Sequence, residues 1–390
     1  MNLVVIPFHD WRKITKEGFR TRDAHFIESF TNSNDVNKLI IINRPTTIAE
    51  ILLKRKKRKI LGKLILNENG FALHETCDNV FVIDFISKDI VGQALKKFRW
   101  FIEEYGNDQF IKFINKSLKT LKVNNYNLIS QNIFAHKLYS NLRPKIRLFD
   151  AWDNFCLIDD YENIIGEIES AYSSYAKTSD FWVTNSRDNI SYFSKHKILK
   201  KIHLIKNGVD LKRFNLSNAY ELPEDLKNMK KPVIGFGGKI TQTINVDWLN
   251  FCIENNPNAS FVIIGQILDK KIFNSITKSP NFFYLGDKFY DEYPNYVNAF
   301  DICLVPYHIE EEKKSGTNPI KVYEYLALNK KVIGTNGNGL EDLKNYLFLV
   351  DDKFTMSQEI SKGVLSAKPL FNLKKNSWDT KAKELIALMK

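Results

Sequence analysis

A lysine and a glutamate three residues apart follow an Asn-Pro pair in the second half of the chain. The segment runs Asn318-Pro319-Ile320-Lys321-Val-Tyr-Glu324. Pro319 suits the first turn of a helix and Asn318 its N-cap, so Lys321 and Glu324 share one helical face. Lys321 and the first-turn amides, including that of Ile320, suit a diphosphate, and the carboxylate suits a ribose diol. The pattern favours a sugar-nucleotide pocket over a surface helix with an ordinary ion pair.

A glycine-rich loop forms a second candidate anion site. It follows an apolar run at 233–236 and includes Gly237, Gly238 and Lys239. Glycines let backbone amides approach a phosphate, and the helix expected from Val246 adds its positive end. The loop therefore predicts a diphosphate site with Lys239 as its cation. The alternative is a tight strand-to-helix turn with a solvated lysine.

The same loop does not match a dinucleotide-binding fingerprint. That fingerprint needs Gly or Ala at the position of Ile240, and it needs an acidic residue where the next strand ends. The strand instead ends at Gly265-Gln266. NAD binding is therefore not expected, whereas Gln266 remains a candidate nucleotide contact.

Two carboxylates follow an apolar run in the first half, at Asp150 and Asp153. At the end of a strand, either can serve as the general base that an acceptor hydroxyl requires. We favour Asp153, with Asp150 second; an Asp that caps the next turn is an equally good explanation. His25 is a third candidate base, although a histidine at a helix start is more often structural.

Short apolar runs alternate with helix-length stretches along the whole chain, which is typical of parallel sheets covered on both faces. The expected strands are Leu3–Phe8, Lys38–Ile42, Val80–Phe85, Tyr126–Ser130, Ile146–Phe149, Phe181–Thr184, Ile202–Ile205, Val233–Phe236, Phe261–Ile264, Phe282–Leu285, Ile302–Val305, Lys331–Gly334 and Leu347–Val350. The expected helices include Arg22–Phe30, Tyr161–Ala176, Val246–Glu254 and Ile320–Leu328.

The alternation runs twice, with a polar break at 214–231. It predicts an α/β protein of two Rossmann-like, doubly wound domains that face each other across a cleft, where loops leave the carboxyl ends of the strands. We place an acceptor-binding domain at 1–215 and a nucleotide-sugar-binding domain at 216–370. The final segment, 371–390, has helical periodicity and is expected to cross back to the first domain.

Length and composition agree with two full cores. The chain has 390 residues, of which 44% are hydrophobic, and a net charge of +12 that favours anionic partners. Four scattered cysteines without a CxxC pair fit neither a disulfide framework nor a zinc site, and suit a reducing cytoplasm. No apolar run approaches the length of a membrane span. A cytoplasmic protein is expected, peripheral to a membrane at most.

Taken together, these motifs resemble the GT-B glycosyltransferases. The segment at 318–327 with 330–335 resembles their donor site, closest to the bacterial polysaccharide enzymes of the teichuronic-acid and xanthan glucuronosyltransferase kind and to those like glycosyltransferase family 4. In the same order, 179–186, 205–210 and 286–301 resemble the strand before the linker, the Asn-Gly-Val-Asp segment and the stretch that supports the base. The resemblance covers about 149–350. It implies the GT-B fold and sugar transfer from a nucleotide-sugar, with UDP expected, in synthesis of a surface polysaccharide such as capsule or lipopolysaccharide.

The resemblance also implies roles for particular residues. Phe289 lies in the stretch that supports the base, and Tyr307 ends the strand before the donor segment. Arg20 and Arg22 resemble an Arg-rich loop that could hold an acidic or pyrophosphate acceptor. Many retaining members carry a Glu where this chain has Gly316, with Glu310, Glu311 and Glu312 nearby but out of register. We therefore lean to an inverting reaction.

No metal or other cofactor is expected, because the chain has no Asp-x-Asp motif and Lys239, Lys321 and helix amides can meet the diphosphate charge. The acceptor is expected to be a glycan or a lipid-linked saccharide. A basic run at 54–59 and a basic-aromatic segment at 96–101 suggest contact with anionic lipids of the inner membrane face. A solvated charge run is the plainer explanation for 54–59.

Two other functions stay open on this evidence. A sugar-nucleotide epimerase on the same fold would consume the donor without an acceptor. A nucleic-acid-binding protein would use the positive charge, although the basic run is short and no recognised nucleic-acid-binding module appears. No nucleic-acid partner is therefore expected.

Overall fold

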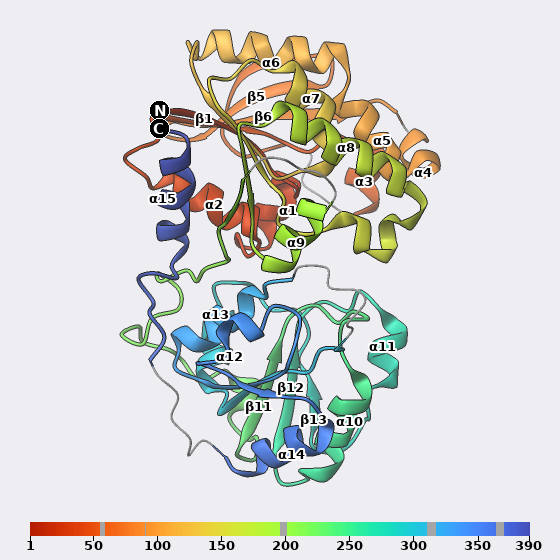
Figure 1. Ribbon diagram of the computed structural model, residues 1–390, viewed down its shortest axis with the longest axis vertical. Coiled ribbons are helices and arrows are strands. Elements are labelled where there is room, and N and C mark those ends of the chain that lie inside the picture. Colours follow the sequence, from red (N-terminus) through yellow and green to blue (C-terminus); the bar gives the residue numbers. More distant parts are fainter. Residues whose placement is uncertain (55–58, 90, 196–200, 310–316, 364–369) are drawn as a thin grey trace. The chain divides into compact units, whose positions relative to one another are not determined.

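The computed structural model describes residues 1–54, 59–89, 91–195, 201–309, 317–363 and 370–390 (Figure 1). It divides into two compact units. The N-terminal unit comprises Met1–Lys206 with Lys381–Lys390, and the C-terminal unit comprises Asn207–Thr380. The first unit therefore ends before the expected boundary at 215, because the residues from Asn207 onward pack with the second unit.

A largely parallel sheet forms the centre of the N-terminal unit. Its strands are β1 (Asn2–Ile6), β2 (Lys38–Ile42), β3 (Thr46–Thr47), β4 (Lys63–Glu68), β5 (Phe71–Cys77), β6 (Val80–Ser87), β7 (Asn127–Ser130), β8 (Arg147–Asp150), β9 (Phe181–Thr184) and β10 (Ile202–Leu204). They follow the order β10-β9-β8-β7-β1-β2-β6-β5-β4, with β3 beside β6. The strands from β10 to β6 are parallel, and β5 pairs antiparallel with both of its neighbours.

Strand β1 lies where the order of this sheet reverses. The chain moves from β1 to β2 on one side and later returns to β7 on the other side. Val4 pairs in register with Ile40 of β2 and with Leu128 of β7. In open parallel sheets, ligands bind outside the carboxyl ends of strands at such a point. A ligand-binding edge of this sheet is therefore expected at the loops that follow β1, β7 and β8.

Helices cover both faces of this sheet (Figure 1). They are α1 (Trp11–Lys16), α2 (Arg22–Thr31), α3 (Ile48–Leu53), α4 (Gly92–Lys96), α5 (Phe98–Tyr105), α6 (Asp108–Thr120), α7 (His136–Asn141), α8 (Ile165–Thr178) and α9 (Arg187–Lys195). Short 3-10 turns occur at η1 (Ile133–Ala135), η2 (Phe155–Leu157) and η3 (Asp159–Ile164). Val4 and Ile6 pack in one core with α5 to α8. Leu3 and Val5 alternate to the opposite face and are also buried.

The C-terminal unit contains a second parallel sheet. Its strands are β11 (Val233–Gly237), β12 (Ser260–Ile264), β13 (Phe282–Tyr284), β14 (Ile302–Val305), β15 (Lys331–Thr335) and β16 (Phe348–Val350). Their order is β13-β12-β11-β14-β15-β16, and each neighbouring pair is parallel. Here the order reverses between β11 and β14, so the loops after these two strands meet at the expected ligand-binding edge.

Two hydrophobic cores enclose this second sheet. Its helices are α10 (Val246–Asn255), α11 (Lys270–Ser275), α12 (Tyr293–Ala299), α13 (Ile320–Ala327) and α14 (Lys353–Ser361), with 3-10 turns at η4 (Glu224–Leu226) and η5 (Glu341–Leu343). Residues of α12 and α13 pack on one face of the sheet, and residues of α10 and α14 on the other. The strand residues alternate between these two cores, as a pleated sheet requires.

The last helix, α15 (Trp378–Leu388), carries the chain back to the N-terminal unit. Leu385 and Ile386 are buried there, and Asn127 at the start of β7 donates to the Met389 carbonyl over 2.9 Å. Lys390 forms an ion pair with Asp35 at 2.7 Å. The two chain ends thus lie side by side in this unit (Figure 1).

The segment at 96–101 differs from the continuous basic-aromatic helix that its sequence suggested. Helix α4 ends at Lys96, and Lys97 interrupts the helical path with a φ of 50° before α5 begins. Trp100 and Phe101 are buried in the core of the unit, where aromatic burial is more favourable than exposure. These aromatic side chains therefore cannot contact a membrane. Of the other basic run, residues 55–58 lie outside the described part of the chain.

Among the described residues, no helix combines the length and the apolar character that crossing a bilayer requires.

Substitution of Leu385 by Ala should lower the free energy of unfolding by about 2–5 kcal/mol, because it leaves a cavity under α15. Lys383, which is exposed on the same helix, provides the control, and Lys383→Ala should change stability by less than about 0.5 kcal/mol. Urea unfolding followed by circular dichroism measures both. Equal stability of the two variants would contradict the docking of α15.

Candidate functional site

Lys321 lies at the carboxyl edge of the second sheet, where its order reverses. It is the second residue of α13, and its Nζ donates to the Tyr307 hydroxyl at 2.8 Å. The ammonium also lies 4.0 Å from the centroid of the Phe236 ring, a cation–π contact. Because Phe236 is the last residue but one of β11 and Tyr307 follows β14, the lysine is held between the two strands that flank the reversal.

The amides of the two predicted glycines are already hydrogen bonded inside the unit. The N–H of Gly237 donates to the Tyr325 hydroxyl at 2.8 Å, and that of Gly238 donates to the Ile264 carbonyl at 2.8 Å. These two N–H groups are therefore not free to meet a phosphate in this structure, and the diphosphate site expected at the loop stays a prediction. They are bonded because the loop packs tightly against β12 and α13.

These glycines instead make room for neighbouring groups. Gly238 has a φ of +147°, and a Cβ there would lie 2.2 Å from Lys321 Nζ. Gly265, after β12, has a φ of +144°, and its Cβ would lie 1.9 Å from the Gly238 carbonyl oxygen. Such backbone conformations favour glycine. Because residue 238 has no side chain, the Lys321 ammonium can occupy this space.

Three other backbone amides remain available at this edge. The N–H groups of Lys239, Ile320 and Lys321 have no acceptor among residues 201–309 and 317–363. The side chain of Lys239 is exposed and pairs with none of those residues. Free first-turn amides and a nearby ammonium attract an anion through both hydrogen bonding and the helix dipole. The arrangement can bind a phosphate or diphosphate.

Helix α13 begins at Ile320, as its sequence predicted, but its N-cap lies one residue later than expected. Pro319 is its N-cap, and no side chain caps the helix. The Asn318 side chain instead accepts from the backbone N–H of Asn207 at 2.8 Å and from the Tyr323 hydroxyl at 3.1 Å. Its Nδ2 is buried and has no hydrogen-bond partner in the described chain. Asn318 therefore anchors the segment that begins at Asn207 to the start of α13.

Glu324 is held by a tyrosine. It is 4% exposed, and its Oε1 accepts from the Tyr290 hydroxyl at 2.6 Å. Burial, followed by the nearby Glu324 carboxylate, raises the pKa of Tyr290 well above its usual value, so the phenol stays protonated as a donor. The Arg213 guanidinium lies 5.3 Å from the centroid of the Tyr290 ring and bonds to Asp291 at 2.7 Å. A carboxylate can accept several hydrogen bonds, so an oriented Glu324 suits a diol.

Two further predicted contacts lie on neighbouring loops of the same unit. Gln266 follows β12, and its Nε2 donates to Asp287 at 2.8 Å. Phe289 is 46% exposed, unusually high for an aromatic side chain, on the loop that leads into α12. An exposed ring provides a face on which a nucleobase can stack. Gly316, Glu310, Glu311 and Glu312 lie outside the described residues.

In the N-terminal unit, Asp150 is engaged in a buried ion pair. Arg22 contacts it through Nε at 2.9 Å and Nη2 at 3.0 Å, and Gln131 donates to the same carboxylate at 2.9 Å. Arg22 and Asp150 are 5% and 1% exposed. The predicted acceptor contact and the second predicted base are thus paired with each other. A buried pair of this kind positions the loops around it and is not open to a substrate.

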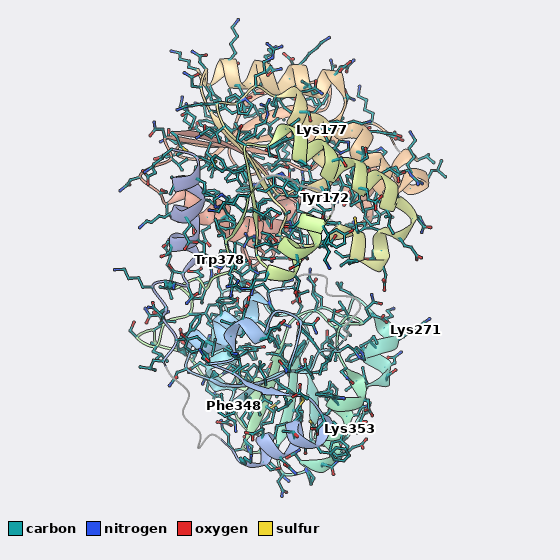
Figure 2. The ribbon with its side chains drawn as sticks, viewed as in Figure 1. Tyr172, Lys177, Lys271, Phe348, Lys353 and Trp378 are labelled. Carbon is teal, nitrogen blue, oxygen red and sulfur yellow. The ribbon has the colours of Figure 1, made fainter. Side chains whose placement is uncertain are left out.

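The remaining predicted residues of this unit differ in accessibility. His25 is buried in α2, with 1% of its surface exposed. Arg20 is half-buried and bonds through Nε to Glu17 at 3.2 Å. Asp153 is half-buried, and its backbone carbonyl accepts from Tyr172, which is labelled in Figure 2. Of the three predicted bases, Asp153 therefore has the side chain that a substrate can reach.

Sequence reasoning missed a histidine at the end of β1. His9 Nδ1 lies 3.0 and 3.1 Å from the two carboxylate oxygens of Asp23, and its backbone N–H also donates to Asp23 at 2.8 Å. A His three residues beyond a central strand was the available signal. Its partner is 14 residues further along the chain, beyond any local motif.

Comparison with known proteins supports the fold that the sequence predicted. No protein-family model matches the chain. A stretch of 139 residues is 26% identical to a Bacillus subtilis protein assigned provisionally to teichuronic acid biosynthesis as the glycosyltransferase TuaH. That stretch spans 35% of this chain and 35% of TuaH, so the likeness covers about a third of each protein.

Solved structures resemble the chain over its whole length. HepE from Anabaena in complex with UDP has a TM-score of 0.60 at 12% identity and matches 100% of this chain and 95% of its own. A TarM variant from Staphylococcus aureus with bound UDP has a TM-score of 0.55 at 12% identity, covering 100% and 97%. UDP-GlcNAc 2-epimerase from Neisseria meningitidis has a TM-score of 0.52 at 13% identity, covering 100% and 99%. The chain has the GT-B fold with two Rossmann-like domains, as its sequence predicted.

The close approach of two glycines at the candidate donor site can be tested by substitution. Gly265→Ala places a methyl group against the Gly238 carbonyl, whereas Gly286→Ala places one in open space at a φ of +75°. Both variants bear the strain of a positive φ, but the first adds a steric clash of about 1–3 kcal/mol. Thermal or urea unfolding should therefore find Gly265→Ala less stable than Gly286→Ala. The reverse order would contradict the geometry of the loop.

Proposed function

We propose that the chain is a glycosyltransferase that moves a sugar from a UDP-sugar to a glycan or lipid-linked saccharide in bacterial surface polysaccharide synthesis. One observation carries the proposal. The Lys321 ammonium lies against Gly238, beside backbone amides without acceptors, at the edge where the strand order of the sheet reverses. Two similar solved structures contain UDP, and TuaH is assigned to glycosyl transfer. This site and those likenesses together support the proposal.

In this proposal the donor is bound by the C-terminal unit. The Lys321 ammonium, the first-turn amides of α13 and Lys239 neutralise the diphosphate without a metal ion. Glu324, oriented by Tyr290, accepts from the ribose hydroxyls. Phe289 stacks on the base and Gln266 contributes a polar contact nearby. Tyr307 both holds Lys321 and retains its own hydroxyl proton to donate to a phosphate oxygen.

The proposed reaction inverts the configuration at the sugar. The acceptor oxygen forms a bond to the anomeric carbon while the bond from that carbon to the β-phosphate oxygen breaks, and UDP leaves with the bonding electron pair. Cationic groups at the diphosphate stabilise the charge that develops on the leaving group. A general base must take the proton of the acceptor hydroxyl. Asp153 is the accessible one of the three predicted bases.

A sugar-nucleotide epimerase is a second candidate, favoured by the likeness to the Neisseria epimerase. An epimerase returns an isomeric UDP-sugar, whereas a transferase releases UDP and lengthens an acceptor. Chromatography of the products from one UDP-sugar separates the two functions. Free UDP with a glycosylated acceptor supports the transferase, and an isomerised nucleotide-sugar without free UDP supports the epimerase.

A leucine–lysine surface on the N-terminal unit suits a lipid-linked acceptor. Its leucines are Leu52, Leu53 and Leu95, which are 71%, 84% and 77% exposed. Its lysines are Lys54, Lys88, Lys96 and Lys97, each exposed. Exposed apolar side chains with exposed lysines close to them in the sequence match the boundary between acyl chains and anionic headgroups.

Hydrogen bonds keep the two halves of this leucine–lysine surface together. Gln93 of α4 bonds to Thr47 at 2.8 Å and to Glu50 of α3 at 2.7 Å. The exposed leucines of α3 and α4 therefore belong to one surface. We propose that this surface makes reversible contact with anionic phospholipid on the inner face of the cytoplasmic membrane.

Donor binding is tested by calorimetric titration of UDP into two variants. Lys321→Ala and Glu324→Ala should each weaken UDP binding by about 1.5–3 kcal/mol, roughly 10- to 150-fold, because each removes a charge-assisted hydrogen bond. Lys271→Ala is the matched control, since Lys271 is exposed on α11 and points away from the unit (Figure 2). UDP affinity that neither Lys321→Ala nor Glu324→Ala changes would contradict the site.

Membrane contact is tested by sedimentation with phosphatidylglycerol vesicles. The double variant Leu53→Glu/Leu95→Glu should lose most of its binding, because each inserted leucine contributes about 1.5–3 kcal/mol and the added carboxylates are repelled. Leu216→Glu, which changes a leucine 58% exposed in the C-terminal unit, should bind like the original chain. Equal binding by all three proteins would exclude the leucine–lysine surface.

A further inference from the structure

Strand β4 is the last strand of the N-terminal sheet, and one of its two sides is not paired. It bonds to β5 alone, and the strand order ends with it. Apart from that ladder, the backbone of 63–68 has no hydrogen-bond partner in the part of the chain that the structure describes. A row of unpaired N–H and C=O groups at a sheet edge is a template on which another strand can pair.

The surface along this edge is open to solvent and partly apolar. Leu61 and Leu64 are 74% and 51% exposed. Ile65 and Leu66, at the middle of the strand, are only half-buried where they pack against the core of the unit. Covering apolar side chains that water now reaches is favourable, so a strand laid along β4 gains apolar burial as well as backbone hydrogen bonds.

A β-bulge in β4 puts the charged residues at its two ends on the same face of the sheet. The register against β5 shifts by one residue within the strand, so β4 has one residue more than the stretch it faces. Lys63 and Glu68 lie opposite Glu75 and Phe71, which share a face because they are four residues apart. Directly opposed residues of antiparallel strands also share a face, so the Lys63 and Glu68 side chains do too.

These two charges are complementary under two-fold symmetry. If a second β4 runs antiparallel beside the first and is centred on the bulge, Lys63 faces Glu68 of the second copy at one end, and Glu68 faces Lys63 of that copy at the other. Lys63 has no ion-pair partner among the described residues, and Glu68 pairs in its own chain with Lys116. That pair is exposed and therefore weak, so Glu68 remains able to meet a second lysine.

We propose that β4 pairs with β4 of a second copy, so that the chain forms a two-fold symmetric dimer with one sheet continuous across both N-terminal units. A lysine on an edge strand normally keeps other strands away. Here it selects the partner, because a strand with an acid at the matching position offsets the cost of covering the ammonium. The contact is short compared with the ~1,600 Å² of a standard interface, so the dimer forms reversibly and its population rises with concentration.

Sedimentation velocity over a wide range of chain concentrations tests the proposal. The original chain should shift toward the mass of two chains as its concentration rises. Lys63→Glu and Glu68→Lys each place like charges at both ends of the paired strands, and each should raise the dissociation constant of the dimer by about 10-fold or more. An equimolar mixture of the two variants should dimerise again, because every contact between residues 63 and 68 of the two different chains then joins opposite charges.

The matched control is Lys177→Glu, which reverses an exposed charge on α8, the helix that joins β8 to β9 near the opposite end of the sheet. It should dimerise like the original chain, and circular dichroism should show that all the variants are folded. An original chain that stays monomeric at every concentration would overturn the proposal, as would a dimer that neither Lys63→Glu nor Glu68→Lys weakens. A mixture of these two variants that associates no better than either alone would overturn the pairing of Lys63 with Glu68.

Discussion

The ammonium of Lys321 occupies the space where a side chain at residue 238 would stand, and this constraint shapes much of the C-terminal unit. It requires a glycine at residue 238, directly after β11, and the adjoining loop after β12 requires Gly265, since a Cβ there would strike the Gly238 carbonyl. Phe236 and Tyr307 hold the ammonium from two strands. A strongly hydrated cation kept at the edge of a sheet, next to unpaired amides, is a natural counterion for a diphosphate.

The two units share a plan but differ in the chemistry at the sheet edge. In each, the strand order reverses beside the first strand, and the loops after that strand carry the polar groups. The C-terminal edge presents a cation and N–H donors. The N-terminal edge presents the nitrogen of His9, with Asp23 behind it, next to a buried ion pair between Arg22 and Asp150. One edge thus presents positive charge and N–H donors, and the other presents a histidine anchored by a carboxylate.

The sequence predicted the elements of the site better than their contacts. Periodic apolar runs located β11, β14 and α13 to within about a residue, because burial in a sheet or on a helix leaves a local pattern. The choice of Lys321 as the cation of the donor site relied on such local spacing. The hydrogen bonds of the Gly237 and Gly238 amides could not be predicted from local spacing, since their acceptors come from α13 and β12. Residues paired across large sequence separations, such as Arg22 and Asp150 at 128 residues, leave no periodic signal.

Calorimetric titration of the unsubstituted chain with UDP, GDP, CMP and ADP, without added metal, tests the central claim most directly. If the edge around Lys321 is a nucleotide-sugar site, UDP binds more tightly than the other three nucleotides. Because the claim places a diphosphate on Lys321 and the first-turn amides, CMP should bind weakly. If none of the four nucleotides binds, the edge around Lys321 is not a nucleotide site, and this chain does not bind its donor there.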